Sequence, residues 1–389
     1  MSGGTRSYEM ARRLVDKGCS VSLITSSRNG ATEQIISYEA GIKVYWIPVP
    51  YNNEMNFFSR LFAFSSFAIK SSWLALRLEA DVVFASSTPL TVAIPGLLTK
   101  LFKRVPLVFE VRDLWPAVPI AMGILKNPFL IWLSKTLEKL VYTYSDQIVA
   151  LAPGMRDEIA AINGSKNKIS VIQNGCDLSV FETEERVAGD FLRAKYPWLS
   201  DRKIVLYTGT FGLANGVEYA VDLAGSMAVL NSDVIFVLIG AGARKKQIEE
   251  YAKARGVLDK NLYLLEPVPK LQVAEWLAIS DFTLGLFSGP RILWKDAVQN
   301  KFFDSLAAGK PMACNFEGYQ SRVAVENEVG IILNPIDVSE AAKELSNKLG
   351  DADWMSQART NAMELASGEF NRDKLANKLH RIFESVHMS

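Results

Sequence analysis

The chain has 389 residues, which exceeds a typical single domain and predicts two domains. Its 43 basic and 42 acidic residues leave a net charge of +1, which argues against nucleic acid as a partner. The three cysteines, Cys19, Cys176 and Cys314, lack metal-binding spacing and form no disulfide framework, which favours a reducing cytoplasm. We also expect no secretion signal and no transmembrane helix, because no apolar run reaches 18 residues.

Strands and helices alternate through the first half of the chain. After a helix at 7–17, short apolar runs rich in β-branched residues predict strands, and helical segments separate them. The predicted strands cover residues 21–25, 42–47, 81–85, 106–111, 147–151 and 169–172. Because buried strands that alternate with helices form parallel sheets, this half is predicted to be a doubly wound α/β domain.

The segment 56–77 is unusual because it combines five Phe and one Trp with basic charges only. One interpretation is a helix in a membrane interface, with Arg60, Lys70 and Arg77 directed toward anionic headgroups. The alternative is a helix buried against a sheet, where Phe at helical spacing is ordinary. The sequence leaves both interpretations open.

Arg112 and Asp113 directly follow the predicted strand at 106–111. The carboxyl ends of parallel strands are where α/β proteins build their sites. Asp113 could orient or deprotonate an acceptor hydroxyl, and Arg112 could hold a phosphate with two hydrogen bonds. A structural Arg–Asp pair that caps a helix is the alternative.

A polar stretch at 182–202 is predicted to link the two halves, after which the strand pattern restarts. The later strands are predicted at 203–208, 234–239, 261–265, 282–286, 311–314 and 330–333. The second half is therefore also predicted to be an α/β unit. We expect the active site between the two units, at the carboxyl ends of their strands.

Two glycine-rich turns follow strands of the second half. Gly209-Thr210-Phe-Gly212 ends the first of them, and Gly240-Ala-Gly242 ends the second, shortly before Arg244. Glycines let the backbone approach a ligand, and free N–H groups at a helix start bind phosphate. A tight structural turn is the alternative. An NAD-binding fingerprint is disfavoured because Lys245 occupies the position of its third glycine.

Asp296 and Asp304 stand eight positions apart, and Asp304 lies in a short predicted helix that Gly309-Lys310-Pro311 ends. Asn300 is predicted to cap the start of this helix. Its apolar face comprises Phe302, Phe303, Leu306 and Ala307. A carboxylate among such residues needs a partner, and a ribose diol is one possibility. Pairing of Asp304 with Lys301, or with the helix dipole, is the alternative.

Taken in order along the chain, these residues resemble one family. Asp296 and Asp304 with the following Gly-Lys-Pro resemble the Glu-x7-Glu region of retaining GT-B glycosyltransferases of the GT4 type. Other runs are similar to the bacterial branch that includes the L-fucosamine transferases of surface polysaccharide assembly: Glu110-Val-Arg-Asp-Leu-Trp-Pro116, Ser86-Ser-Thr-Pro-Leu-Thr91, Ile172-Gln-Asn-Gly-Cys-Asp177 and Tyr207-Thr-Gly-Thr-Phe-Gly-Leu-Ala-Asn-Gly216.

The resemblance covers nearly the whole chain and implies an α/β GT-B fold, in which two Rossmann-like doubly wound domains face a cleft. It implies an acceptor-binding domain at 1–190, a nucleotide-sugar-binding domain at 191–366, and a final helix at 367–389 that crosses back onto the first domain. The first strand of the fold would be missing, because Gly3 and Gly4 stand almost at the start of the sequence.

The resemblance also implies a role for each site residue. Asp304 would bind the donor ribose, Asp296 the donor sugar, and Val268 the base through its backbone. The diphosphate would lie against Gly209, Thr210 and Gly212, with Arg244, Asn300 and Lys301 as further donor contacts. Gly3 and Gly4 would border the donor from the first domain. Arg112 and Asp113 would face the acceptor.

The implied activity is transfer of a sugar, an N-acetylated amino sugar among the candidates, from a nucleotide diphosphate to a lipid-linked saccharide. It would proceed with retention and without a metal or cofactor, with a UDP-sugar as donor and a polyprenyl-diphosphate-linked saccharide as acceptor. The protein would then work at the inner face of the cytoplasmic membrane. An inactive GT-B paralogue that acts as a scaffold is the first alternative, and a sugar-nucleotide epimerase is the second. The chain has only two histidines, His380 and His387, which argues against the epimerase.

Overall fold

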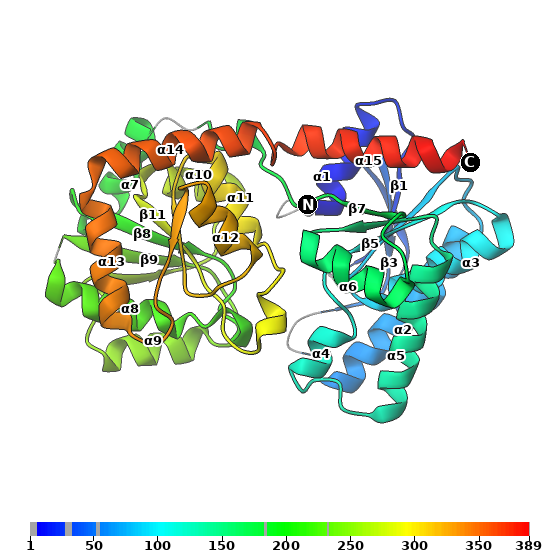
Figure 1. The fold of residues 1–389 in the computed structure, drawn as a ribbon, viewed down its shortest axis with the longest axis horizontal. Helices are drawn as coiled ribbons and strands as arrows, with labels where there is room; N and C mark the ends of the chain where they lie inside the picture. The colour runs from blue at the N-terminus through cyan, green and yellow to red at the C-terminus, as the bar shows by residue number, and fades with distance from the viewer. Residues whose placement is uncertain (1–5, 28–32, 52–54, 183–184, 232, 389) are drawn as a thin grey trace. The chain divides into compact units, whose positions relative to one another are not determined.

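The computed structural model describes residues 6–27, 33–51, 55–182, 185–231 and 233–388 (Figure 1). The chain divides into two compact units. The C-terminal unit comprises Asn174–Arg372, and the N-terminal unit comprises the described residues before 174 together with the segment from Asp373 onward. Each unit is an α/β domain built on parallel strands, which confirms the predicted fold class.

The strands of the N-terminal unit form two sheets. One is parallel, with the order β4 (Val83–Ser86), β5 (Leu107–Val111), β6 (Gln147–Ala150), β7 (Ile169–Val171). The other has the order β1 (Ser22–Ser26), β3 (Ile42–Ile47), β2 (Ile35–Glu39), and β2 runs antiparallel to β3. Strand β2 was not predicted. No strand precedes α1 (Arg6–Val15) among the described residues, and Gly3 and Gly4 lie outside them, so the missing first strand stays a prediction.

Helices cover both faces of the parallel sheet in this unit. On one face, Val108 and Val149 pack against Met10 of α1 and Leu379 of α15 (Arg372–His387). The last helix therefore belongs to the core of the N-terminal unit. The other face carries α3 (Ala93–Lys103) and α5 (Pro128–Tyr144). The remaining helices are α2 (Phe57–Ala75), η1 (Leu90–Val92), α4 (Ala117–Ala121) and α6 (Pro153–Asn163).

The C-terminal unit holds one parallel sheet of six strands. Their order is β10 (Leu262–Leu265), β9 (Val234–Ile239), β8 (Lys203–Thr208), β11 (Phe282–Gly285), β12 (Met312–Cys314), β13 (Gly330–Ile332). Every residue of β9 is buried, as expected for a strand covered on both faces. The strand order reverses between β8 and β11, which are neighbours in space and distant in sequence.

Each face of this sheet has its own apolar core. Helices α8 (Glu218–Leu230), α9 (Lys245–Ala254) and α13 (Val338–Gly350) pack on one face. Helices α7 (Glu185–Lys195) and α10 (Lys270–Ile279) pack on the other. Beside β12 lie α11 (Asn300–Ala307), α12 (Tyr319–Glu326) and α14 (Ala352–Ser367). Short 3-10 turns complete the unit: η2 (Leu178–Val180), η3 (Pro197–Leu199), η4 (Leu213–Asn215) and η5 (Arg291–Leu293).

The linker predicted at 182–202 was wrong. Its described residues are largely ordered structure, since they form α7 and η3 and pack into the C-terminal unit. Ala188 and Leu192 stand one helical turn apart and are buried together with Leu199. The charges that suggested a linker occupy the outer side of an amphipathic helix.

Candidate functional site

The strand order places a candidate ligand site at the carboxyl ends of β8 and β11. In a doubly wound sheet, ligands bind where the strand order reverses, because the connections on either side turn away and leave the strand ends open. The turn after β8 contains Gly209, Thr210 and Gly212, and the segment after β11 leads to α11. Six of the predicted donor residues therefore come from the two segments that flank this point: Gly209, Thr210, Gly212, Asn300, Lys301 and Asp304.

The two glycine turns pack against each other backbone to backbone. The N–H of Gly209 donates to the carbonyl of Ile239 at 3.0 Å, and the N–H of Phe211 donates to the carbonyl of Ala241 at 2.9 Å. A Cβ at Gly240 would stand 1.8 Å from the carbonyl oxygen of Gly209, so only glycine fits there. The turns after β8 and β9 thus form one rigid piece of backbone.

Lys301 reaches this backbone from the first turn of α11. Its Nζ would lie 2.8 Å from a Cβ placed on Gly209, and it stands 3.6 Å from the ring centre of Tyr207. The Nζ atom is buried and has no hydrogen-bond partner among the described residues. Burial lowers the pKa of Lys301 to about 7. A buried amine without a partner is costly, and a phosphate oxygen would complete its hydrogen bonding.

Asp304 lies one turn further along α11, close enough to raise the pKa of Lys301 in opposition to burial. Its Oδ2 pairs with the Nζ of Lys270 at 2.5 Å, whereas the alternative predicted from sequence was a pair with Lys301. Burial raises the pKa of Asp304, and the nearby Lys270 opposes this rise. Phe302, Phe303 and Leu306 are buried, as the apolar pattern predicted.

Asp296 lies between η5 and α11 and is buried, with its Oδ2 3.7 Å from the Nζ of Lys295. The predicted cap of α11 was wrong. Asn300 is the first residue of the helix, and the capping position belongs to Gln299, which makes no side-chain cap hydrogen bond. The side chain of Gln299 instead donates to the carbonyl of Leu286, and this bond ties the start of α11 to the end of β11.

The remaining predicted donor residues surround the same strand ends. Arg244 precedes α9, and its guanidinium pairs with Glu218 at 2.8 Å. Val268 lies between β10 and α10. The hydroxyl of Tyr207 donates to the carbonyl of Thr210 at 2.9 Å and holds the exposed turn after β8. Gly212 begins η4.

The predicted acceptor residues lie in the N-terminal unit, at the carboxyl end of β5. The N–H of Arg112 donates to the hydroxyl of Ser87 at 3.0 Å, which joins this end to the turn after β4. Desolvation of its carboxyl group by neighbouring protein atoms raises the pKa of Asp113. The guanidinium of Arg112 and a hydrogen bond with Thr88 oppose this rise. Asp113 remains accessible to solvent, as a residue that meets an acceptor must be.

The sequence did not predict a buried ion pair that lies beneath the carboxyl end of β5. Arg6 Nε donates to Glu110 Oε1 at 2.7 Å, and a second guanidinium nitrogen donates to the carbonyl of Ile172 at 2.8 Å. The other oxygen of Glu110 accepts from Ser86 at 2.6 Å. Arg6 and Glu110 are 104 positions apart, so local sequence carries no signal of their contact.

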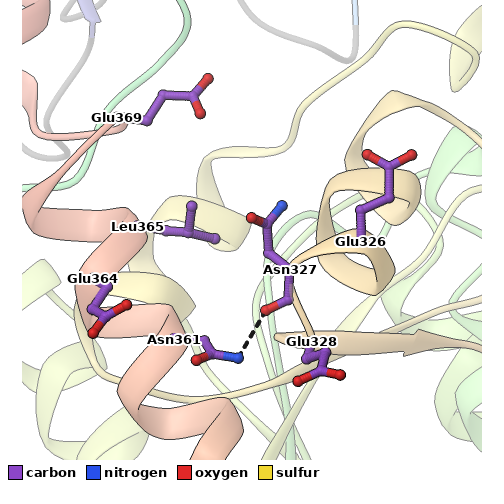
Figure 2. Close-up of a pocket in the computed structure, with 7 residues that line it drawn as sticks. All are labelled: Glu326, Asn327, Glu328, Asn361, Glu364, Leu365 and Glu369. Atoms are coloured by element: carbon purple, nitrogen blue, oxygen red, sulfur yellow. Dashed lines mark hydrogen bonds between the residues drawn. The ribbon is translucent and has the colours of Figure 1, made fainter.

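Figure 2 shows a cavity of about 410 Å³ elsewhere in the C-terminal unit, between α12 and α14. Four glutamates line it together with Asn327, Asn361 and Leu365: Glu326, Glu328, Glu364 and Glu369. No basic side chain lines this cavity, so it would repel a diphosphate. Among the described residues, no three His, Cys, Asp or Glu side chains come together as a metal site.

Comparison with known proteins agrees with this fold. Residues 3–175 match the family described as "Glycosyl transferase 4-like domain", and residues 189–364 match "Glycosyl transferases group 1". The alpha-D-kanosaminyltransferase of Streptomyces kanamyceticus is 21% identical over 53% of this chain and 50% of its own length. The match thus spans about half of that relative. WcaI of Escherichia coli, described as a glycosyl transferase of colanic acid biosynthesis, is 21% identical over 68% of each chain.

Solved structures share the fold. Sucrose-phosphate synthase of Thermosynechococcus elongatus is 15% identical, with a TM-score of 0.78 over 99% of this chain and 94% of its own. HepE of Anabaena, solved in complex with UDP, is 13% identical, with a TM-score of 0.68 over 88% and 86%. The two family matches together account for both units, and the chain belongs to the GT4-type glycosyltransferases with the GT-B fold.

Proposed function

We propose that the protein transfers a sugar from UDP to a lipid-linked saccharide during synthesis of a surface polysaccharide, with retention at the anomeric carbon and without a metal. The described role of WcaI in colanic acid biosynthesis supports synthesis of a polysaccharide. The UDP bound to HepE supports UDP as the nucleotide of the donor. We base the choice of an N-acetylated amino sugar as the group transferred on the resemblance of the sequence runs to L-fucosamine transferases. The acceptor is proposed to be a polyprenyl-diphosphate-linked saccharide at the cytoplasmic face of the membrane.

The observation that carries this proposal is the buried amine of Lys301 beside the glycine turn after β8. A cation and free backbone N–H groups at the reversal point of the sheet suit a diphosphate. When the bond between the sugar and UDP breaks, negative charge develops on the leaving phosphate. Lys301 and the N–H groups of Thr210 and Gly212 would stabilise that charge, which is the electrostatic form of catalysis, while the N–H of Gly209 stays bonded to the carbonyl of Ile239.

The remaining donor residues orient the substrate in this proposal. Asp304 accepts hydrogen bonds from the ribose hydroxyls. Its carboxylate keeps the ion pair with Lys270 at the same time. Asp296 contacts the transferred sugar, Val268 contacts the base through its backbone, and Asn300 and Arg244 stand at the edge of the diphosphate.

Arg112 and Asp113 serve the acceptor. Asp113 orients the attacking hydroxyl and receives its proton as the new glycosidic bond forms. Arg112 holds a phosphate of the carrier. Gly3 and Gly4 border the donor in this proposal, although they lie outside the described residues.

The test is to titrate UDP and GDP into the whole protein in EDTA and then assay UDP-sugars with a polyprenyl-diphosphate-linked acceptor. We expect UDP to bind in the micromolar range without metal, GDP to bind more weakly, and transfer to give the same anomeric configuration as the donor. A folded protein that binds neither nucleotide would refute the proposal.

A second candidate is a catalytically inactive GT-B relative that acts as a binding or scaffold subunit. The pairs that already engage Asp304 and Arg244, with Lys270 and Glu218, favour it, because both predicted donor contacts are satisfied without a ligand. UDP binding with no transfer and no hydrolysis of any UDP-sugar would support this candidate.

A further inference from the structure

Helix α2 exposes a stripe of large apolar side chains along one side. Phe58 and Phe62 are 78% and 77% exposed, and Ile69 and Trp73 continue the same stripe at helical spacing. The side that packs inward carries the small residues Ala63, Ala68, Ser71 and Ser72 together with Leu74. A surface helix normally turns polar residues, and not a second stripe of large apolar ones, toward solvent.

Helix α5 shows a second stripe of the same kind. Phe129 and Trp132 are exposed, the latter at 61%, and their rings stack with centres 6.0 Å apart. Leu133, Leu140 and Tyr144 extend the stripe to the end of the helix. The side that faces the protein is closed by Val141 and Tyr142, and the ring of Tyr142 contacts Phe109 of β5.

The two helices belong to one layer of the N-terminal unit. Both contact η1 and α3, which lie on the same side of the parallel sheet, and Figure 1 shows them within that part of the unit. At the end of α3, Leu101 and Phe102 are also exposed. We call the exposed stripes of α2 and α5 the α2–α5 surface. Exposed apolar patches on soluble proteins often mark sites of interaction with a protein or a membrane.

The exposed charges of these two helices are all basic. Residues 55–78 contain no acid, and their cations are Arg60, Lys70 and Arg77. The guanidinium of Arg77 lies 3.2 Å from the ring centre of Trp73, so one cation caps the end of the apolar stripe. On α5, Lys135 and Lys139 are exposed, and the one acid, Glu138, is buried.

This combination identifies the kind of partner. Aromatic and aliphatic side chains beside lysine and arginine suit the boundary between headgroups and acyl chains of an anionic bilayer. A second copy of the chain is a poorer partner, because two such surfaces would bring cations together without acids to balance them. No helix among the described residues is long and apolar enough to cross a membrane. Contact would therefore be made at the surface of the bilayer.

We propose that the α2–α5 surface binds anionic lipid bilayers directly, with Phe58, Phe62 and Trp132 entering the headgroup boundary. The proposal rests on the proposed function in one respect, since a lipid-linked acceptor gives this binding its purpose. The binding itself requires neither the acceptor nor a nucleotide, so it can be measured separately.

The experiment is sedimentation of the full chain with vesicles of phosphatidylcholine alone or mixed with phosphatidylglycerol, without acceptor lipid. We expect binding to the anionic vesicles only, weakened by high salt. The double variant Phe62→Ser/Trp132→Ser should bind at least about tenfold more weakly. The matched control is Val229→Ser/Ile336→Ser, which removes apolar residues 87% and 90% exposed in the C-terminal unit and should bind like the wild type.

Three results would overturn the proposal: no vesicle binding by the wild type, equal loss in both double variants, or a wild-type dimer that the first double variant dissociates. Circular dichroism and UDP titration of each variant establish that it is folded. Wild-type protein that binds UDP but not vesicles would refute this inference and leave the proposed function standing. Vesicle binding without UDP binding would support this inference and refute the proposed function.

Discussion

Lys301 is the residue on which the candidate donor site depends. Its buried amine has no hydrogen-bond partner among the described residues, although the unit could bury an apolar side chain there at lower cost. Such a group is retained where a ligand supplies the missing partner. The glycine turn beside it leaves room for that ligand, because any side chain at Gly209 would meet the amine.

The affinity for UDP should therefore depend on pH through Lys301. The pKa of its amine is lowered to about 7, and a bound diphosphate would raise it, so binding above pH 7 takes up a proton. We expect the affinity to fall by about tenfold per pH unit above 7 until the pKa of the bound state is reached. Calorimetry between pH 6.5 and 9 measures this slope. A flat profile would mean that the amine does not meet the phosphate.

Asp304 and Asp296 should separate binding of the nucleotide from binding of the sugar. Asp304→Ala removes the proposed ribose contact and should weaken UDP binding by about 10- to 100-fold, the effect of losing a charged hydrogen bond. Asp296→Ala should leave UDP binding unchanged and weaken binding of the UDP-sugar. Titration of both ligands into both variants provides the comparison. Equal effects on UDP would contradict the assigned roles.

At this scale the sequence predicted where the residues lie better than what they contact. Asp304 was predicted from the local pattern and Lys301 from the family resemblance, and Lys301 reaches the glycine turn after β8. The partner of Asp304 was missed because Lys270 is 34 positions away and follows a Pro-Val-Pro run that carries no sign of an ion pair. The Arg6–Glu110 pair was missed for the same reason. Contacts between distant segments depend on topology, which side-chain patterns do not encode.

The glycine turns after β8 and β9 are the elements that shape the donor site. Their backbones are in direct contact, so the position of one turn fixes the position of the other. Helix α11 is held in place separately, through Gln299 and the buried face of Phe302 and Phe303. A change confined to the turns should therefore disturb ligand binding more than it disturbs the core.

Gly240→Ala tests the contact between the turns. Its new Cβ would meet the Gly209 carbonyl oxygen, and the clash should cost about 1–3 kcal/mol and displace the phosphate-binding backbone. We expect a lower Tm and weaker UDP binding. Gly225→Ala in α8 is the matched control, since its Cβ finds its nearest neighbour at 3.8 Å. The control should keep UDP affinity and the wild-type Tm or a slightly higher one. A wild-type affinity for Gly240→Ala would show that the turns are not part of the site.

Most elements could be predicted because buried parallel strands form continuous apolar runs. Strands β8 and β9 begin and end at the predicted residues. Strand β2 was missed because it is largely exposed and follows no apolar pattern. Helix α7 was mistaken for a linker because charged residues are as numerous as apolar ones in its sequence. The 56–77 segment forms a helix that packs on the domain along one side and exposes Phe58, Phe62 and Trp73 on the other, and its membrane interpretation stays a prediction.

At the scale of the whole molecule, the chain consists of two compact units with separate cores. The predicted donor residues from Gly209 to Asp304 belong to the C-terminal unit, and Arg112 and Asp113 belong to the N-terminal unit. The last helix supplies Leu375 and Leu379 to the N-terminal core, so the end of the chain stabilises its beginning. Nucleotide binding and the stability of the N-terminal unit should thus be separable.

Leu379→Ala tests that separation. The side chain is fully buried in α15 against the N-terminal unit, and its loss should cost about 2–5 kcal/mol. UDP should still bind with wild-type affinity. Leu345 is equally buried, in the core of the C-terminal unit. Leu345→Ala should therefore lower the Tm of the C-terminal unit, and bound UDP should raise that Tm by mass action. Calorimetric scans of both variants, with and without UDP, provide the comparison. A loss of UDP binding in a folded Leu379→Ala protein would contradict independent units.

The most direct measurement is the affinity of UDP for the wild type, Lys301→Met and Lys310→Met at pH 7 in EDTA. Lys310 is the matched control, because it is also a buried lysine of the C-terminal unit but precedes β12, at the opposite ends of the strands, beside Glu185. We predict micromolar binding that EDTA does not change in the wild type and in Lys310→Met, and a loss of about tenfold or more in Lys301→Met. Equal affinity in all three proteins, or no binding by the folded wild type, would contradict a donor site at the carboxyl ends of β8 and β11.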